Sequence, residues 1–238
     1  MCMKSVLITG GTIRLGKAIA ERLRADGWRV LTSSHRADAG ADIVADLAEP
    51  MGAAKLYAAA LQLLGGMPPD ALVNNAALFT GDDAAIAAVN FEAPKKLTMM
   101  MAGRETGMGA VVNVLDAAAS CSSCSSNSSD ASRSSDSSDA SQASPGYRET
   151  KRDLGAFTLS SAMMFAATLR VNGVAPGPVL APTDVHEKAG ETLLGRRPTP
   201  EDVAAAVAYL LGAEAVTGTV IPVDAGQHLV SLELSVES

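Results

Sequence analysis

The chain has 238 residues, 47% of them hydrophobic, and a formal net charge of −7. This length predicts one domain, residues 1–238, with a substantial core, and the acidic balance without a basic run excludes nucleic acid as an expected partner. No apolar run is long enough for a secretory leader or a membrane-spanning helix, so we expect a cytoplasmic protein with no membrane partner.

Short apolar runs alternate with stretches of helical periodicity along the chain. We expect strands at 4–9, 28–33, 43–45, 71–74, 110–115, 169–174 and 220–223, and helices at 14–25, 52–64, 83–101, 147–167 and 200–211. The link between the second and third strands has no room for a full helix. This alternation predicts an α/β fold, a Rossmann-type doubly wound parallel sheet of about seven strands with helices on both faces. Ligands then bind at the carboxyl ends of the strands.

The first turn, 9–16, follows a strand and opens a helix, with the sequence TGGTIRLG. A helix that begins there presents free backbone N–H groups and the positive end of its dipole, which together suit a pyrophosphate. Gly10 can take backbone angles that a Cβ would forbid, and Gly16 lets the helix and the strand pack closely. Arg14 stands where many nucleotide-binding loops carry a further glycine. Its guanidinium can reach a second phosphate, which favours NADPH over NADH.

The end of the second strand also bears on the choice of dinucleotide. Folds that prefer NAD place an Asp or Glu there, which accepts hydrogen bonds from the ribose hydroxyls. This chain has Ser34, His35 and Arg36 instead, and no carboxylate before Asp38. These three side chains can bind a 2′-phosphate through charge-assisted hydrogen bonds. A solvated turn is the alternative, but it leaves the missing acid unexplained, so we predict NADP(H) as the cofactor.

Residues 117–144 break the alternation because half of them are serine and none has a large apolar side chain. Such a segment cannot bury enough surface to offset its ordering entropy, so we predict a Ser-rich insertion that forms a surface loop. The alternative is a lid, since the segment leaves the fifth strand above the ligand crevice. Cys121 and Cys124 form a CxxC inside it, but further metal ligands are missing, so we expect no metal site.

Tyr147 and Lys151 lie four residues apart at the start of a predicted helix, which places them on one face. A nearby ammonium favours a phenolate, so Lys151 is expected to lower the pKa of Tyr147 and make its hydroxyl a better proton donor or acceptor near neutral pH. Such a pair is common by chance on surface helices. Behind the glycine loop and ahead of Pro176-Gly177 it is a much stronger indication of a catalytic site.

Five marks in this order resemble the short-chain dehydrogenase/reductase family along nearly the whole chain: the glycine loop, Asn74-Asn75-Ala76, Asn90, the Tyr147/Lys151 pair and the run 172–177. The resemblance implies that Lys151 holds the nicotinamide ribose and that Asn90 supports a water relay to Lys151. It also implies a homotetramer or homodimer. The cofactor contacts that it implies, with those argued above, are Gly10, Thr12, Ile13, Arg14, Leu15, Ser34, His35, Arg36, Asp46, Leu47, Asn75, Ala76, Ala77, Tyr147, Lys151, Pro176, Gly177 and Val179.

Asp116 follows the fifth strand, where the family's catalytic serine is expected. With Arg14 in the loop and Phe79 after the Asn-Asn-Ala run, it resembles the pteridine reductases, a subgroup of this family. Phe79 would then sandwich a pterin ring against the nicotinamide, and Asp116 would pass a proton from water to Tyr147. The resemblance implies Asp116, Tyr147, Lys151 and Asn90 as catalytic residues, and Arg14, Phe79, Asp116 and Tyr147 as substrate contacts.

Two features depart from this subgroup. Asp116 and Tyr147 are 31 positions apart, more than the family allows, and Ala77 replaces a serine that contacts the pterin. Residues 180–194, with His186 and Glu187, are expected to cover the substrate, and Thr199 is predicted to cap the next helix. We therefore expect an NADPH-dependent reductase acting on a dihydropterin or dihydrofolate. The alternatives are an NADPH-dependent carbonyl or quinone reductase and a non-catalytic NADPH-sensing protein.

Overall fold

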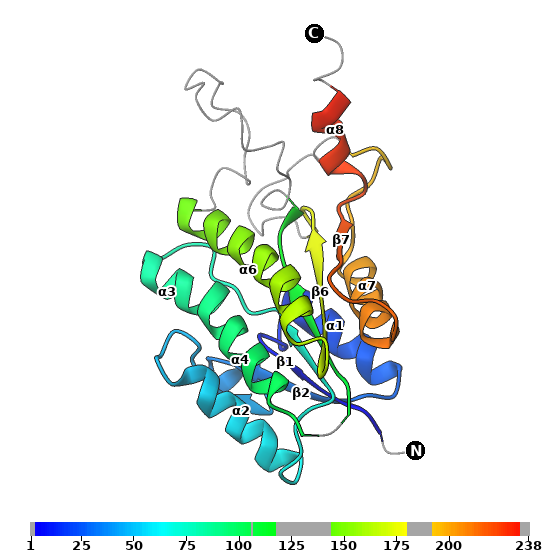
Figure 1. The fold of residues 1–238 in the computed structure, drawn as a ribbon. Coiled ribbons are helices and arrows are strands. Elements are labelled where there is room, and N and C mark those ends of the chain that lie inside the picture. Colours follow the sequence, from blue (N-terminus) through cyan, green and yellow to red (C-terminus); the bar gives the residue numbers. More distant parts are fainter. Residues whose placement is uncertain (1–2, 106, 118–143, 180–191, 234–238) are drawn as a thin grey trace.

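The computed structural model describes residues 3–105, 107–117, 144–179 and 192–233 (Figure 1). Seven strands form one sheet in the order β3-β2-β1-β4-β5-β6-β7, and all neighbouring strands are parallel. The predicted Rossmann-type sheet is therefore confirmed, and each strand lies within two residues of its predicted ends. The strands are β1 (Ser5–Ile8), β2 (Arg29–Ser34), β3 (Ile43–Val44), β4 (Ala71–Asn74), β5 (Gly109–Val114), β6 (Leu169–Pro176) and β7 (Val220–Val223).

Helices cover both faces of this sheet (Figure 1). One face packs against α1 (Arg14–Ala25) and α7 (Pro200–Gly212). The other packs against α2 (Gly52–Leu63), α4 (Ala93–Ala102) and α6 (Pro145–Met164). The shorter helical elements are the 3₁₀ turn η1 (Ala37–Ala39), α3 (Asp83–Ala87), the π turn η2 (Ala88–Glu92) and α8 (Gln227–Glu233).

The central strands are buried on both faces, which explains their continuous apolar runs. In β1, Val6 and Ile8 pack toward α1 and α7, whereas Leu7 packs toward α2 and α4, and all three side chains are inaccessible to solvent. The sheet therefore divides the core in two. Its order reverses between β1 and β4, so a crevice is expected at the carboxyl ends of these strands.

Three elements differ from the prediction. The helix expected over 83–101 is interrupted by the π turn η2, which carries Asn90. The helix expected to begin at Tyr147 begins two residues earlier, because Ser144 caps it and Pro145 occupies its first position. The helix α8 was not predicted. Its start is held by the buried carboxylate of Asp224, which accepts hydrogen bonds from the backbone N–H groups of Gly226 and His228.

Several predicted features lie outside the described residues. These are residues 118–143 of the Ser-rich insertion, with Cys121 and Cys124, and residues 180–191 of the expected substrate-covering segment, with His186 and Glu187. The chain is described again at Thr192, from where it leads to α7.

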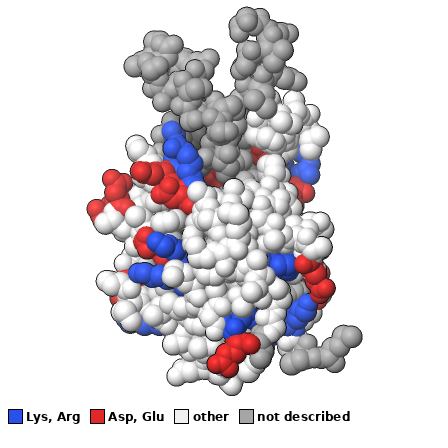
Figure 2. Space-filling view, in the orientation of Figure 1, with Lys and Arg blue, Asp and Glu red and all other residues white. Residues whose placement is uncertain are grey.

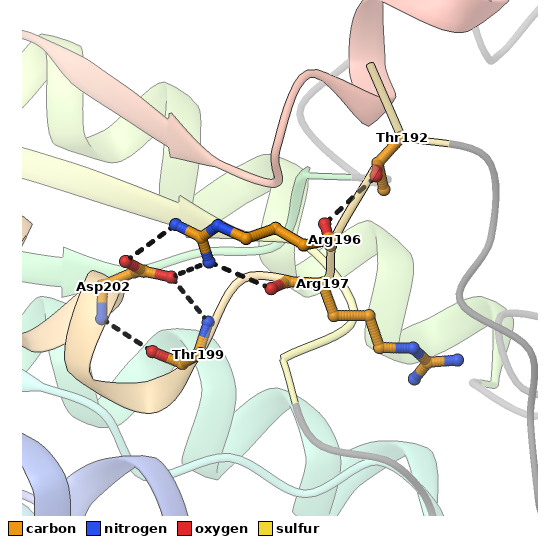
Figure 3. A network of polar contacts seen from close by, with 5 residues as sticks. All are labelled: Thr192, Arg196, Arg197, Thr199 and Asp202. Atoms are coloured by element: carbon orange, nitrogen blue, oxygen red, sulfur yellow. Dashed lines mark hydrogen bonds and ion pairs between the residues drawn. The ribbon is translucent and has the colours of Figure 1, made fainter. Parts of the chain in front are cut away.

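A reciprocal cap fixes the start of α7 (Figure 3). The Thr199 hydroxyl accepts a hydrogen bond from the Asp202 N–H, and the Asp202 carboxylate accepts one from the Thr199 N–H. Arg196 donates to both oxygens of the same carboxylate, at 2.6 and 3.1 Å. These bonds, the one from Arg196 first, lower the pKa of Asp202 to about 2. The prediction of Thr199 as the N-cap is confirmed.

The surface of this fold carries mixed charges. In the orientation of Figure 1, positive and negative side chains stand beside one another in small groups around a broad uncharged area (Figure 2). Among the described residues, no helix combines the length and the apolar character needed to cross a bilayer.

The buried Arg170 of β6 closes the other end of α7, and its removal is expected to destabilise the fold. Its guanidinium donates to the carbonyl oxygens of Leu210, Leu211 and Val216 at 2.8–3.1 Å. Arg170→Met leaves these carbonyls without that donor, so we expect the free energy of unfolding in urea to fall by about 2–4 kcal/mol.

The matched control is Arg22→Met, which removes an exposed arginine paired with Asp26 on α1. It should cost less than about 1 kcal/mol. Equal losses in the two variants would contradict the proposed capping role of Arg170.

Candidate active site

The turn after β1 allows no side chain at its closest contact. Gly10 has a φ of +64°, and a Cβ built on Gly16 would lie 2.0 Å from the carbonyl oxygen of Gly10. The first turn of α1 therefore lies directly against the backbone at the end of β1. The structure confirms the close packing of helix and strand that was predicted for Gly16.

A bracket of hydrogen bonds joins this turn to the end of β4. The Thr9 hydroxyl accepts from the N–H groups of Asn75 and Ala76 at 2.9 and 3.0 Å. The Asn75 amide donates to the carbonyls of Thr9 and Gly10, both at 3.0 Å. The predicted residues Asn75 and Ala76 therefore lie beside the glycine turn. Thr9 was not assigned a role from the sequence, although its place before Gly10 was a usable signal.

The start of α1 is suited to a dinucleotide phosphate. No described side chain caps this helix, and Ile13 and Arg14 are exposed beside its first N–H groups. Thr12 and Leu15 are partly exposed on the same turn. The tight approach at Gly16 brings the start of α1 against the end of β1, where a Cβ would collide with the Gly10 carbonyl and the Asn75 amide. Arg14 has a φ of +49°, a conformation that favours glycine.

The end of β2 lies beside the same turn, because the Gly11 N–H donates to the Ser33 carbonyl at 3.1 Å. The Ser34 hydroxyl accepts from the Arg36 N–H at 3.1 Å, and His35 and Arg36 are exposed. The Arg36 guanidinium contacts both carboxylate oxygens of Asp38. The predicted phosphate-binding side chains therefore lie beside the glycine turn. One of them, Arg36, is already paired with the carboxylate of Asp38.

Three catalytic candidates meet above β5. The Tyr147 hydroxyl donates to Asp116 at 3.0 Å, although 31 positions separate the two residues. The Lys151 ammonium donates to the Val114 carbonyl at 2.7 Å and lies 5.8 Å from the centre of the Tyr147 ring. Tyr147 and Lys151 are 4% and 3% exposed. The long separation between Asp116 and Tyr147 therefore does not keep the two apart.

The expected effect of Lys151 on Tyr147 is wrong for this structure. The pKa of Tyr147 is raised, first by burial and then by the charge and hydrogen bond of Asp116. Burial lowers the pKa of Lys151 to about 8, and the charge of Asp116 acts in the opposite direction. Desolvation thus dominates both groups. Tyr147 is held in its protonated form, which suits a proton donor.

Phe79 and Asn90 border this cluster. The Phe79 ring stacks on the Tyr147 ring with centroids 4.8 Å apart, and 55% of Phe79 is exposed. The buried amide of Asn90 accepts from the N–H of Leu78 at 2.8 Å and donates to its carbonyl at 2.9 Å. Asn90 therefore positions the backbone next to Phe79. Its predicted water relay to Lys151 stays a prediction.

The remaining predicted cofactor contacts lie on loops that follow strands or, for Pro176, at the last position of β6. Gly177 follows β6 and leaves no room for a Cβ, which would lie 2.7 Å from the Cβ of Asp224. Val179 packs partly buried against the core beside α1 and α7, and Leu47 is buried in the core under α2. Asp46 is exposed and accepts from the Ala48 N–H, and Ala77 and Pro176 are partly exposed.

A buried amide network that was not predicted supports the site from below. The Asn74 amide donates to Asn113 at 2.8 Å, and Asn113 donates to Thr158 at 2.9 Å, which joins β4, β5 and α6. The signal in the sequence for this network was the presence of polar residues, Asn74 and Asn113, in the otherwise apolar strands β4 and β5. The described residues contain no cluster of His, Cys, Asp and Glu that could hold a metal ion.

Comparisons with known proteins find relatives along nearly the whole chain. A family model described as enoyl-(acyl carrier protein) reductase matches residues 14–228. The chain is 31% identical to the "putative ketoacyl reductase 2" of the granaticin polyketide synthase of Streptomyces violaceoruber, over 94% of this chain and 95% of that protein. It is 28% identical to glucose 1-dehydrogenase 2 of Bacillus subtilis, over 97% of each.

A solved structure resembles the chain along the same length. The crystal structure of FolM alternative dihydrofolate reductase 1 from Brucella canis, complexed with NADP, has a TM-score of 0.76 and 29% identity. The match covers 95% of this chain and 94% of that chain. Because the family model spans most of the chain and these relatives align along nearly its whole length, the chain belongs to the short-chain dehydrogenase/reductase family of oxidoreductases.

Proposed function

We propose that this oxidoreductase is an NADPH-dependent reductase of a dihydropterin or dihydrofolate ring. The observation that carries the proposal is the hydrogen bond from Tyr147 to Asp116 beneath the exposed ring of Phe79. It combines a proton donor with a flat apolar surface for an aromatic substrate. The likeness to a dihydrofolate reductase that binds NADP supports the same substrate class.

The reaction needs a hydride at a ring carbon and a proton at the adjoining ring nitrogen. The cofactor, when bound, supplies the hydride. Tyr147 donates its hydroxyl proton to the ring nitrogen, and Asp116 returns a proton to Tyr147 from water. Lys151 supports the exchange from its buried place beside the Val114 carbonyl.

NADP(H) fits the donors around the first turn. The uncapped N–H groups of α1 would hold the pyrophosphate, with Arg14 beside them. Ser34, His35 and Arg36 would bind the 2′-phosphate. The loops after β3 and β4, with the end of β6 and the loop after it, would enclose the adenine and the nicotinamide, through Asp46, Leu47, Asn75, Ala76, Ala77, Pro176, Gly177 and Val179.

A carbonyl or quinone substrate is the second candidate. The sequence relatives include a ketoacyl reductase and a glucose dehydrogenase, and Ala77 lacks the hydroxyl expected for a pterin site. The homotetramer or homodimer also stays a prediction. The exposed Met99, Met163 and Met164 are apolar side chains of the kind that a subunit interface covers.

The substrate class is tested by NADPH oxidation with dihydrobiopterin and dihydrofolate, compared with a panel of ketones and quinones. We expect turnover of the pterins, and Phe79→Ala should raise the KM for dihydrobiopterin about 3- to 10-fold by removing the stacking surface. Phe79→Tyr, which keeps an aromatic ring, is the matched control and should restore the KM. Good ketone turnover without pterin turnover would reject the pterin assignment, and the enzyme would then be a carbonyl reductase.

Tyr147→Phe tests catalysis as such. Removing the proton donor should lower kcat by about 10²- to 10⁴-fold. The Kd for NADPH, measured by fluorescence titration, should stay within about twofold of the original value. Tyr209→Phe, at an exposed position on α7, is the control and should have no effect. If the Tyr147 variant keeps full activity on every substrate, the non-catalytic NADPH-sensing alternative is favoured.

The lowered pKa of Lys151 predicts the pH dependence. We expect kcat/KM for reduction to fall as the pH rises through about 8, where the ammonium loses its proton. Asp116→Asn removes the charge that favours this ammonium, so the remaining activity should decline at a lower pH. If the pH profile of kcat/KM is unshifted in Asp116→Asn, the assignment of this pH dependence to Lys151 is contradicted.

A stability measurement gives an independent check on Lys151. Between pH 8 and 10.5 the unfolded chain binds a proton that the buried amine of the folded chain has released, so the free energy of unfolding should rise with pH there. Lys151→Met should abolish that part of the rise.

A further inference from the structure

We propose that Asp38 sets the cofactor preference of this chain by competing with the 2′-phosphate of NADPH for the Arg36 guanidinium. The inference rests on the proposed NADPH site and adds a residue that opposes it. Asp38 would not touch the reacting atoms. Its effect would appear as a ratio of affinities for the phosphorylated and unphosphorylated dinucleotides.

The contact between the two side chains is bidentate. Arg36 Nε donates to Asp38 Oδ1 at 3.0 Å, and Arg36 Nη2 donates to Oδ2 at 2.9 Å. Two parallel N–H donors are what a phosphate also takes from an arginine. The carboxylate therefore occupies the Nε–Nη2 face of the guanidinium, one of the two bidentate faces that a 2′-phosphate could use.

The backbone holds this pair near the glycine turn. Ser33 accepts from Gly11 at 3.1 Å, so the end of β2 lies beside the start of the turn. Ser34 then accepts from the Arg36 N–H at 3.1 Å, and the 3₁₀ turn η1 carries Asp38 back toward Arg36. The competition is thus built into one short turn and needs no movement of the sheet.

Exposure makes the pair exchangeable. The side chains of Arg36 and Asp38 are 59% and 72% exposed, and an exposed ion pair contributes little to stability. A phosphate, with nearly two charges, can displace the carboxylate, but it binds less tightly than it would to an unpaired arginine. NADH has no 2′-phosphate, so Asp38 does not compete with it.

Direct titration of NADPH and NADH, followed by nicotinamide fluorescence, tests the proposal without turnover. In Asp38→Asn we expect the Kd for NADPH to fall about 2- to 10-fold, with no such tightening for NADH. The matched control is Asp26→Asn, which removes an exposed carboxylate from Arg22 at the far end of α1. It changes the net charge equally and should leave both Kd values unaltered.

Two further variants separate the possible outcomes. In an Arg36→Gln background, Asp38→Asn should lose most of its effect on NADPH, because the donors it would release are gone. An equal gain in that background, or an unchanged ratio of Kd values in Asp38→Asn alone, would overturn the proposal. If Arg36→Gln does not weaken NADPH binding at all, the proposed 2′-phosphate site itself fails.

Discussion

The approach of α1 to the end of β1 is the constraint on which the site depends. With Gly16 against the Gly10 carbonyl, the helix starts as close to the sheet as two backbones allow. Its free N–H groups then open at the point where the strand order reverses. Thr9 and Asn75 tie the neighbouring ends of β1 and β4 to the same turn. The proposed phosphate site depends on this packing.

Burial decides the chemistry at the other end of the crevice. A phenol and an amine in an apolar site both favour their neutral forms, and Asp116 opposes ionisation of the phenol while favouring the ammonium. The raised pKa of Tyr147 and the lowered pKa of Lys151 have this common cause. Tyr147 therefore keeps its proton, and this is the state that the proposed reduction needs.

The elements were largely predictable, because buried parallel strands and amphipathic helices leave strong periodicities. The meeting of Asp116 with Tyr147 was expected only through the resemblance to the pteridine reductases. The backbone acceptor for Lys151 could not be predicted, because any residue type at position 114 supplies the same carbonyl. The sign of the pKa shift at Tyr147 was also missed, because burial outweighs a neighbouring ammonium and depends on the packed fold. Helical periodicity does not report the π turn at Asn90.

Arg14 connects the two halves of the cofactor argument. Its left-handed backbone costs about 1–2 kcal/mol relative to a glycine, and its exposed side chain recovers little of that through packing. The phosphate contact proposed for the guanidinium would account for an arginine in a glycine conformation. Arg36 stands at the end of the neighbouring strand β2, so two cations flank the same turn. Asp38 pairs with one of them, so under the proposed function we expect the balance between these three side chains to set the dinucleotide preference.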